Sequence, residues 1–360
     1  MTERQNESPR QSGAETIPES IPESRQLPAD HPPVPAPKLG VLLVNLGSPD
    51  RAETASVRRY LAQFLSDPRV IEIPKLAWQP ILRGVILRTR PAKSAKLYAS
   101  IWDRERDGSP LKLITEDQAS GLQARFPDCR IDYAMRYGSP AVADRLAALK
   151  DAGCERILLL PMYPQYSAAT TATVVDEAHR WMAKTRWQPT MRTAAPWYDD
   201  PAYLDALEAD LRTQLGALDF EPQLLLFTFH GMPKRTLELG DPYHCQCQKT
   251  ARLMAERLDV ATRIVFQSRF GPAEWLQPYL DEALEGLPAE GVQRVAVAAP
   301  GFTADCLETL EEIAIQGREQ FEGAGGAKFA YLDCLNAKPA HLDLLETVIS
   351  RELAGWRESG

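Results

Sequence analysis

Short runs of apolar residues alternate along the chain with longer segments whose apolar residues recur every three or four positions. The runs are apolar at almost every position, which is typical of strands buried on both faces of a sheet. Segments such as 139–153 and 201–218 have the spacing of amphipathic helices and are long enough to lead from one parallel strand to the next. The pattern predicts an α/β fold built on doubly wound parallel sheets, with strands at 40–50, 131–137, 156–167, 224–231, 262–269, 294–302 and 328–336.

The predicted strands fall into two groups, which a proline-marked connection near residue 190 separates. We expect an N-terminal Rossmann-like lobe at 39–190, a similar C-terminal lobe at 191–345 and a last helix or tail at 346–360. Residues 1–38 are polar and proline-rich and lack the features of a targeting signal, so they are expected to form a disordered tail. Ligands of open α/β sheets bind beyond the carboxyl ends of the strands, which places the expected site in a cleft between the lobes.

Charge and cysteine content narrow the range of functions. The 360 residues carry a formal net charge of -8 and show no stripe of Lys and Arg interleaved with aromatic residues, so we expect no binding of nucleic acid. Six cysteines in a chain of this length are too few for a disulfide scaffold and favour a reducing compartment such as the cytoplasm. No apolar run approaches the 18 or more residues that would indicate a membrane-spanning helix.

His230 stands where one of the most apolar runs ends. It is either a packed core or capping residue, or a base held rigidly at the edge of a sheet. Asp305, Glu308, Glu312 and Gln316 recur at three or four residues and so are predicted to share one helix face. That face is either the solvated side of an amphipathic helix or a row of carboxylates that conducts a hard cation or protons. The spacing alone leaves both readings open.

Aromatic residues near the predicted strand ends suggest a cleft for a large planar ligand. Each of them alone would be an ordinary core or rim residue, but together they form flat walls, with Arg136 available to meet an acidic group. The apolar segment 76–90 contains three arginines and is predicted to be a lid helix or a lip that touches a membrane. The aromatic residues are Tyr98, Tyr137, Tyr163, Tyr166 and Trp275.

One close pair of thiols, Cys245 and Cys247, follows His244. The three side chains either ligate a metal or an iron–sulfur centre, or belong to an exposed loop in which the cysteines are incidental.

Several longer motifs occur in a fixed order between about residues 39 and 345. They are GVLLVNLGSPD, SPLKLITEDQ, RYGSP, PMYPQYSAATT, FTFHGMP, GDPY, FQSRFGPAEWLQP and PGFTADCLETLEEI. In these motifs and their order the chain resembles ferrochelatases, the enzymes that insert ferrous iron into a porphyrin to make haem. The resemblance implies two Rossmann-like lobes around a porphyrin cleft, with Fe²⁺ and protoporphyrin IX as substrates. The implied products are protohaem and two protons, in the terminal step of haem biosynthesis.

The resemblance also assigns roles to residues. His230 in FHG matches the active-site histidine of the family, and Glu308 in DCLETL matches the glutamate that faces it across the macrocycle, so both are expected to contact the metal. Asp305 and Glu312 match carboxylates of a path that leads away from the site. The positions that line or anchor the porphyrin are matched by Leu46, Tyr98, Ser109, Arg136, Tyr137 and Trp275.

Departures from the family pattern limit what the resemblance implies. Gln316 replaces a carboxylate of the animal enzymes, Cys306 stands where many members have histidine, and Leu46 replaces a methionine. Ala168 occupies the position of an internal cluster thiol, and no three further cysteines follow the motif LETVISRELAGW. A [2Fe-2S] cluster of the animal type is therefore not expected.

Three alternatives share the same cleft: a coproporphyrin chelatase, a cobalt chelatase, and a non-catalytic tetrapyrrole carrier. For the enzyme we expect a cytoplasmic location, with peripheral contact between segment 76–90 and the inner face of the membrane.

Overall fold

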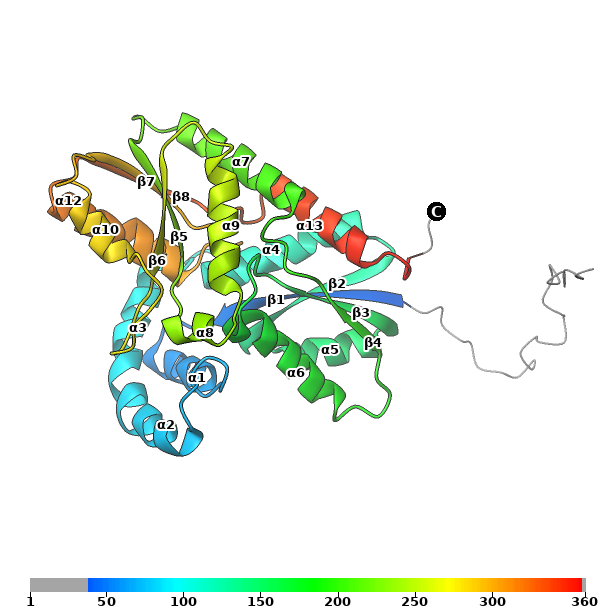
Figure 1. Ribbon diagram of the computed structural model, residues 1–360. Helices are drawn as coiled ribbons and strands as arrows, with labels where there is room; N and C mark the ends of the chain where they lie inside the picture. Colours follow the sequence, from blue (N-terminus) through cyan, green and yellow to red (C-terminus); the bar gives the residue numbers. More distant parts are fainter. Residues whose placement is uncertain (1–37, 358–360) are drawn as a thin grey trace, which may run out of the picture. The chain divides into compact units, whose positions relative to one another are not determined.

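Two four-stranded parallel sheets form the framework of the protein (Figure 1). The computed structural model describes residues 38–357. The tail expected at 1–38 lies outside the described residues, except for Lys38, which begins the first strand. The sheets have the strand orders β2-β1-β3-β4 and β6-β5-β7-β8. The predicted α/β fold with two parallel sheets is confirmed.

The first sheet consists of β1 (Lys38–Ser48), β2 (Cys129–Gly138), β3 (Cys154–Pro161) and β4 (Thr190–Thr193). Its strands are connected by helices α1 (Thr54–Phe64), α2 (Lys75–Ile81), α3 (Leu87–Ile101), α4 (Pro110–Arg125), α5 (Val142–Asp151) and α6 (Thr173–Met182), together with the π-helical segments η2 (Leu82–Ile86) and η3 (Ala168–Ala172). The three strands predicted here are present. Strand β4 was not predicted, because it is a short, half-buried edge strand without an apolar run. The expected lobe boundary at 190 falls within it.

The second sheet consists of β5 (Leu224–His230), β6 (Thr262–Gln267), β7 (Arg294–Ala298) and β8 (Lys328–Leu332), all four of them predicted. Its helices are α7 (Pro201–Gly216), α8 (Lys234–Glu238), α9 (Tyr243–Ala255), α10 (Leu280–Gly286), α11 (Leu307–Leu310), α12 (Arg318–Gly323) and α13 (Pro339–Glu352), with the π-helical segment η4 (Glu312–Gly317) between α11 and α12. The separate segment expected from residue 346 begins in the middle of α13.

Both sheets contribute to one central hydrophobic core. Val41 and Leu43 of β1 face this core, as do Leu225 and Phe227 of β5, because alternate residues of a strand point to the same side. Helices α4, α7 and α13 supply further residues to it, and α13 packs against both α4 and α7 (Figure 1). A second cluster lies on the other face of each sheet, under α5 and α6 in one case and under α10 and α12 in the other. Each sheet is therefore covered on both faces.

The end of β1 requires a glycine. Gly47 has a φ of +106°, and a Cβ atom there would lie 1.8 Å from the carbonyl oxygen of Tyr137 on β2. Only glycine adopts this conformation without a clash. The ends of β1 and β2 can therefore approach each other closely, which brings Ser48 and Tyr137 to the same edge of the sheet.

Segment 76–90 is helical, as predicted for a lid or lip. It runs through α2 and η2 into α3. Its hydrophobic side chains are unusually exposed: Leu76 is 94% exposed, Val85 54% and Ile81 46%. None of the helices between residues 38 and 357 is long and apolar enough to span a membrane.

Candidate active site

His230 is the last residue of β5, a central strand of the second sheet. Its Nδ1 atom lies 2.6 Å from the carbonyl oxygen of Gly231. A carbonyl oxygen can only accept, so Nδ1 must carry the hydrogen and donate it. The other ring nitrogen, Nε2, is then left with its lone pair in a half-buried side chain. This arrangement suits a base that is held in one orientation.

Glu312 is the first residue of η4, and Ser268, just after β6, binds both oxygens of its carboxylate. The backbone N–H of Ser268 donates to Glu312 Oε1 at 2.7 Å, and the Ser268 hydroxyl donates to Oε2 at 2.5 Å. Burial raises the pKa of Glu312, while the hydrogen bonds from Ser268 and the charge of His230 lower it; the charge of Glu308 raises it again. The charges of His230 and Glu308 therefore both act on Glu312.

Glu308 lies in α11 and also acts on the tyrosines of the first lobe. Burial, followed by the charges of other groups that include Glu308, raises the pKa values of Tyr60 and Tyr98. The two rings pack edge to face, with centroids 6.4 Å apart. Tyr98 is a buried residue of α3, and its cluster includes Leu307, the neighbour of Glu308 in the chain.

Asp305 has a different environment from the other two carboxylates. It is 5% exposed and precedes α11, and its oxygens accept hydrogen bonds from Thr309 Oγ1, Tyr331 OH and Asn336 Nδ2 at 2.9, 2.6 and 2.6 Å. The Asp305 carboxylate therefore already accepts three hydrogen bonds from protein groups. It anchors the start of α11 to the loop after β8.

The prediction of one acidic helix face is wrong. Asp305 lies before the helix, and the chain changes to π-helical geometry at Glu312, where an i→i+5 bond joins Gln316 N–H to the carbonyl of Glu311. The 3.6-residue period therefore does not continue past Glu312. Gln316 instead donates from its side chain to the carboxylate of Glu311, at 2.7 and 2.8 Å.

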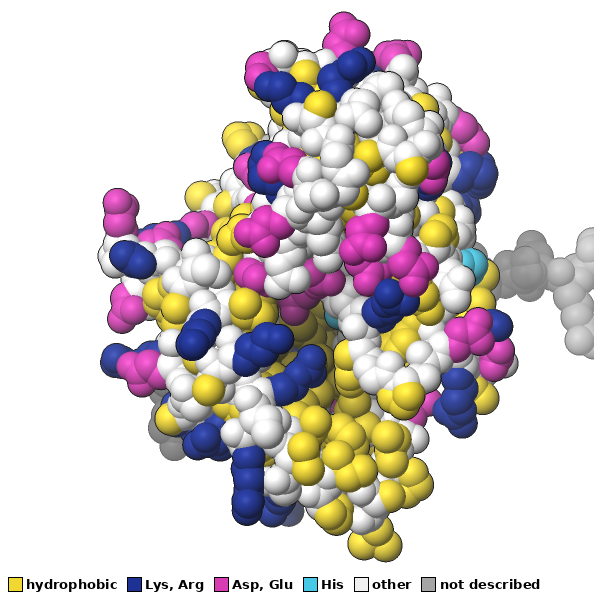
Figure 2. All heavy atoms as spheres, turned by 90° about the vertical axis from the view of Figure 1, so that its left-hand side faces the viewer, with side chains coloured by type: hydrophobic (Ala, Val, Ile, Leu, Met, Phe, Trp, Pro, Cys, Tyr) yellow, Lys and Arg dark blue, Asp and Glu magenta, His cyan; other side chains and the backbone are white. Residues whose placement is uncertain are grey.

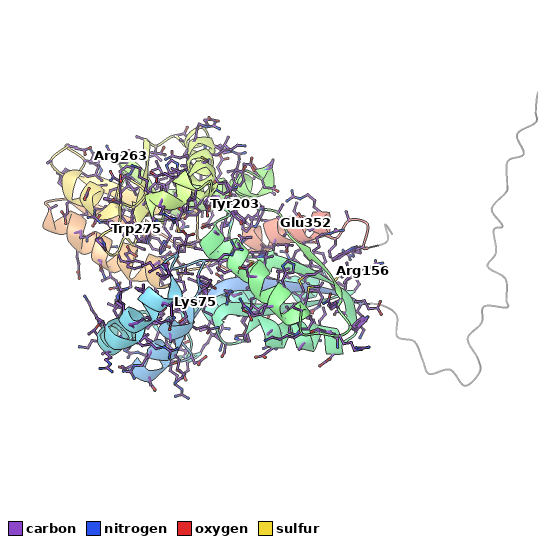
Figure 3. All side chains as sticks on the ribbon, turned by 60° about the horizontal axis from the view of Figure 1, so that its bottom comes forward. Lys75, Arg156, Tyr203, Arg263, Trp275 and Glu352 are labelled. Carbon is purple, nitrogen blue, oxygen red and sulfur yellow. The ribbon has the colours of Figure 1, made fainter. Side chains whose placement is uncertain are left out.

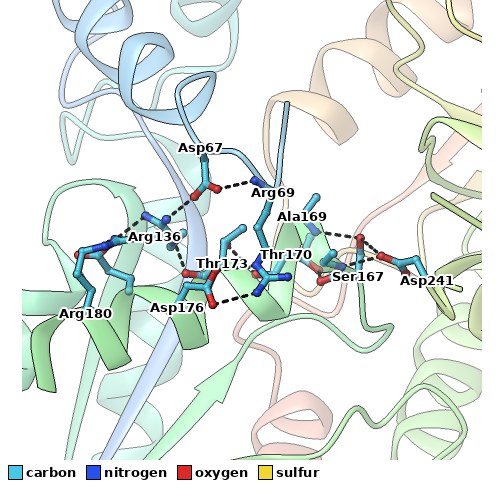
Figure 4. A network of polar contacts seen from close by, with 12 residues as sticks. Asp67, Arg69, Arg136, Ser167, Ala169, Thr170, Thr173, Asp176, Arg180 and Asp241 are labelled. Atoms are coloured by element: carbon cyan, nitrogen blue, oxygen red, sulfur yellow. Dashed lines mark hydrogen bonds and ion pairs between the residues drawn. The ribbon is translucent and has the colours of Figure 1, made fainter. Parts of the chain in front are cut away.

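Arg136 is buried behind the site and already paired. Its guanidinium forms an ion pair with Asp67 and donates from Nε to the carbonyl oxygen of Thr173 at 2.8 Å (Figure 4). Tyr137 donates to the same carboxylate of Asp67 at 3.0 Å, and burial raises the pKa of its phenol. A ligand carboxylate could contact Arg136 only by displacing Asp67, a partner that sequence reasoning missed because it lies 69 residues away.

Ser109 and Leu46 lie where β1 meets α4. The Ser109 hydroxyl caps α4 by accepting from the N–H of Lys112 and forms a short hydrogen bond with the Ser48 hydroxyl. Leu46 is partly buried against a small cluster that includes Cys306. Both residues support the wall of the first lobe.

Trp275 lies in the segment after β6, where Figure 3 labels it. A Cβ atom on Gly231 would lie 3.2 Å from Cε3 of Trp275, so the indole packs against the backbone next to the histidine. The indole N–H donates to the carbonyl oxygen of Phe270 at 3.0 Å, and the two rings lie 5.2 Å apart. Trp275 is thereby fixed as a flat surface at the site.

Cys245 and Cys247 lie in the first turns of α9 and not in an exposed loop. Residues two apart on an α-helix point about 200° apart, which explains why Cys245 is exposed and Cys247 fully buried. The two thiols therefore cannot bind one metal from this helix. No group of three or more His, Cys, Asp or Glu side chains among residues 38–357 has the arrangement of a metal site.

Figure 2 shows a hollow on the face that lies to the left in Figure 1. Its walls are largely hydrophobic, acidic side chains lie above it, and Lys and Arg side chains lie beside it. An apolar, concave surface with a few polar groups is typical of a site for an organic ligand.

Comparison with known proteins places the chain in a family. The family model described as Ferrochelatase matches residues 38–353. A protein of Rhizobium meliloti (strain 1021) named ferrochelatase is 54% identical over 333 residues, which are 91% of this chain and 98% of that protein. A ferrochelatase of Azoarcus sp. (strain BH72) is also 54% identical, over 89% of each chain.

Solved structures support the fold alone. SirB from Bacillus subtilis with Fe³⁺ has a TM-score of 0.54 at 12% identity and covers 89% of this chain and 97% of its own. DR2241 from Deinococcus radiodurans, described as similar to chelatases, has a TM-score of 0.52 at 12% identity and covers 90% of this chain and 56% of its own. The family match and the identity to the bacterial proteins, over nine tenths of the chain, show that this chain belongs to the ferrochelatase family.

Proposed function

We propose that the protein is a cytoplasmic ferrochelatase that inserts Fe²⁺ into protoporphyrin IX and releases protohaem and two protons. The activity is that of a lyase, as in its family. One observation carries the proposal: His230 ends β5 with the lone pair of Nε2 free, and Gln267, its partner in register on β6, is hydrogen-bonded to Glu312 and to the backbone of Glu308. A base and an acidic pair are what a porphyrin needs to exchange its pyrrole protons for a metal ion.

Metallation requires three changes in the substrates. Two N–H protons must leave the porphyrin, Fe²⁺ must lose its water ligands, and the flat ring must distort so that the nitrogen lone pairs can reach the metal. His230 Nε2 accepts one of the two protons with its single lone pair, because the orientation of its ring is already set by the Gly231 carbonyl, and the carboxylates of Glu308 and Glu312 are the bases available for the other. A fixed base avoids the entropy cost of orientation during the reaction.

Glu308 and Glu312 handle the metal ion and protons. Carboxylate oxygens bind divalent ions less tightly than several thiolates would, so iron can be released to the porphyrin nitrogens. Burial already raises the pKa of Glu312, which suits a group that takes up and passes on protons. Asp305 acts as a positioning residue in this proposal, because three donors already hold it.

The porphyrin lies between walls from both lobes. In this proposal the rings of Tyr98 in the first lobe and Trp275 in the second, each 6% exposed, lie directly behind the two walls and keep them flat, and Leu46 fills the wall near α4. Arg136, Tyr137 and Ser109 keep that wall in place through their contacts with Asp67 and Ser48.

Anaerobic metallation assays test the proposal. Wild-type protein, His230→Ala and, as a control, His179→Ala on the exposed side of α6 are given Fe²⁺ and protoporphyrin IX, and porphyrin fluorescence is followed. We expect many turnovers by the wild type and the control, and about a 10²–10⁴-fold loss in His230→Ala. Product limited to one equivalent per chain would indicate a carrier. Turnover only with coproporphyrin III or only with Co²⁺ would identify one of the related chelatases.

Segment 76–90 provides a surface for peripheral contact with a membrane. Leu76 and Val85 are exposed hydrophobic residues, and Arg83 and Arg88 lie close by in the same helical run, beside an open cavity of about 570 Å³. Apolar and basic side chains together favour an anionic lipid surface.

Vesicle sedimentation tests this contact. Leu76→Ser combined with Val85→Ser should weaken binding to anionic vesicles, whereas Leu239→Ser, which alters another exposed leucine, should not. Equal binding by all three proteins would rule out the lip as the contact.

A further inference from the structure

One amide side chain joins the strand of His230 to the helical segment that carries the carboxylates. Gln267 ends β6 and pairs in register with His230. Its Oε1 accepts from the Thr228 hydroxyl at 3.0 Å, two residues before His230 on β5. Its Nε2 donates to the carbonyl oxygen of Glu308 at 2.8 Å and to a carboxylate oxygen of Glu312 at 3.3 Å. Gln267 is therefore bonded to both sides of the site.

The next residue, Ser268, makes its contacts from an uncommon backbone conformation. Its φ of +65° lies in the left-handed region, which costs energy for residues other than glycine. In this conformation its N–H and its hydroxyl each donate to a different oxygen of Glu312. A strained residue that holds both oxygens of one half-buried carboxylate points to a functional requirement on the position of that carboxylate.

We propose that Gln267 and Ser268 are positioning residues for metal insertion, which fix Glu308 and Glu312 at a constant separation from His230. The inference rests on the proposed function, because it concerns the same site. Gln267 is 3% exposed and its amide is occupied by protein groups, so it acts through the carboxylates and does not contact a substrate. Groups that orient metal-binding side chains commonly change activity by about 10–100-fold when they are removed.

Substitutions at the two positions separate positioning from stability. Gln267→Leu removes the donor and the acceptor while keeping much of the volume. Ser268→Gly removes the hydroxyl but also relieves the strain of the left-handed conformation. Ser268→Ala removes the hydroxyl and keeps the strain. Gln277→Leu is the matched control, because Gln277 is an exposed glutamine of the same segment.

Metallation kinetics and thermal unfolding are measured for each protein. We expect kcat to fall about 10–100-fold in Gln267→Leu and about tenfold in both Ser268 variants. The KM for porphyrin should stay near the wild-type value, because neither residue lines the porphyrin. Ser268→Gly should have a Tm equal to or above that of the wild type, so its activity and stability would not fall together. The Gln277 control should match the wild type in all three quantities.

Other outcomes would overturn the inference. A wild-type kcat in the Ser268 variants would show that the bonds to Glu312 are dispensable. If Gln267→Leu does not fold, the kcat of the Ser268 variants alone tests the inference. Loss of porphyrin binding in step with kcat would instead place the two residues in the porphyrin wall. If the wild type itself does not metallate porphyrin, the proposed function fails as well. An active wild type with equally active variants overturns only the inference.

Discussion

Lowering the pH should destabilise the protein through His341, a histidine to which the proposed mechanism gives no role. His341 of α13 is 0% exposed. Its Nδ1 lies 2.5 Å from the carbonyl oxygen of Asn336 and so carries the hydrogen, whereas Nε2 has no hydrogen-bond partner among the described residues. A proton on Nε2 would create a buried charge with an unpaired donor. Burial therefore lowers the pKa of the imidazole from 6.5 to about 4.

The size of the effect follows from proton linkage. Between about pH 6.5 and pH 4 the unfolded chain carries a proton on His341 and the folded protein does not. Acid therefore favours the unfolded state, by about 1.4 kcal/mol for each pH unit within that window. From pH 7 to pH 5 this histidine should remove about 2 kcal/mol from the free energy of unfolding. The contribution is fully present above pH 6.5 and is lost as the pH falls toward 4.

Urea unfolding at pH 7, 6 and 5 measures this contribution. His341→Gln keeps an amide that can donate to Asn336 but cannot take up a proton. The loss of stability between pH 7 and pH 5 should be about 2 kcal/mol smaller in this variant than in the wild type. His179→Gln, an exposed histidine, should follow the wild type. If His341→Gln loses as much stability on acidification as the wild type, the linkage to His341 is refuted.

Two further predictions concern the first-lobe wall and the thiols of α9. Asp67→Asn should lower the free energy of unfolding by about 3 kcal/mol in urea titrations, because it leaves the buried guanidinium of Arg136 with only the more distant carboxylate of Glu177, at 3.8 Å; a loss below about 1 kcal/mol would show that the pair with Asp67 is dispensable. Iodoacetamide should label Cys245 in the native protein but not Cys247, whose pKa burial raises, and mass spectrometry of the peptide that contains both would detect any reversal of this order.

The strands were predictable because they are buried on both faces, and a run of apolar residues is sufficient to reveal such a strand. Strand β4 was missed because an edge strand of one exposed and three half-buried residues carries no such signal. The position of His230 at a strand end was visible in the sequence. Its ring orientation was not, because it depends on the carbonyl of Gly231.

The failures of prediction at the site have physical causes of two kinds. The acidic face was predicted from a 3.6-residue period that the π-helical segment at Glu312 interrupts. Asp67, which holds the guanidinium of Arg136, was missed because it is distant in the sequence. Ser268 was missed because the sequence does not show that a serine has a left-handed backbone conformation. Interactions between distant residues and local departures from regular geometry were the features that the sequence did not reveal.

The central core, to which both sheets contribute, constrains how the protein can move. The two lobes look separate in the order of their strands, yet Val41 and Leu225 belong to the same hydrophobic cluster. A hinge between the lobes would expose that cluster to water at a cost of about 25 cal/mol for each Å² of apolar surface. The cleft should therefore behave as a slot of nearly constant width. Leu76 and Val85 lie outside that cluster and already stand in solvent, so the segment that carries them can move without this cost.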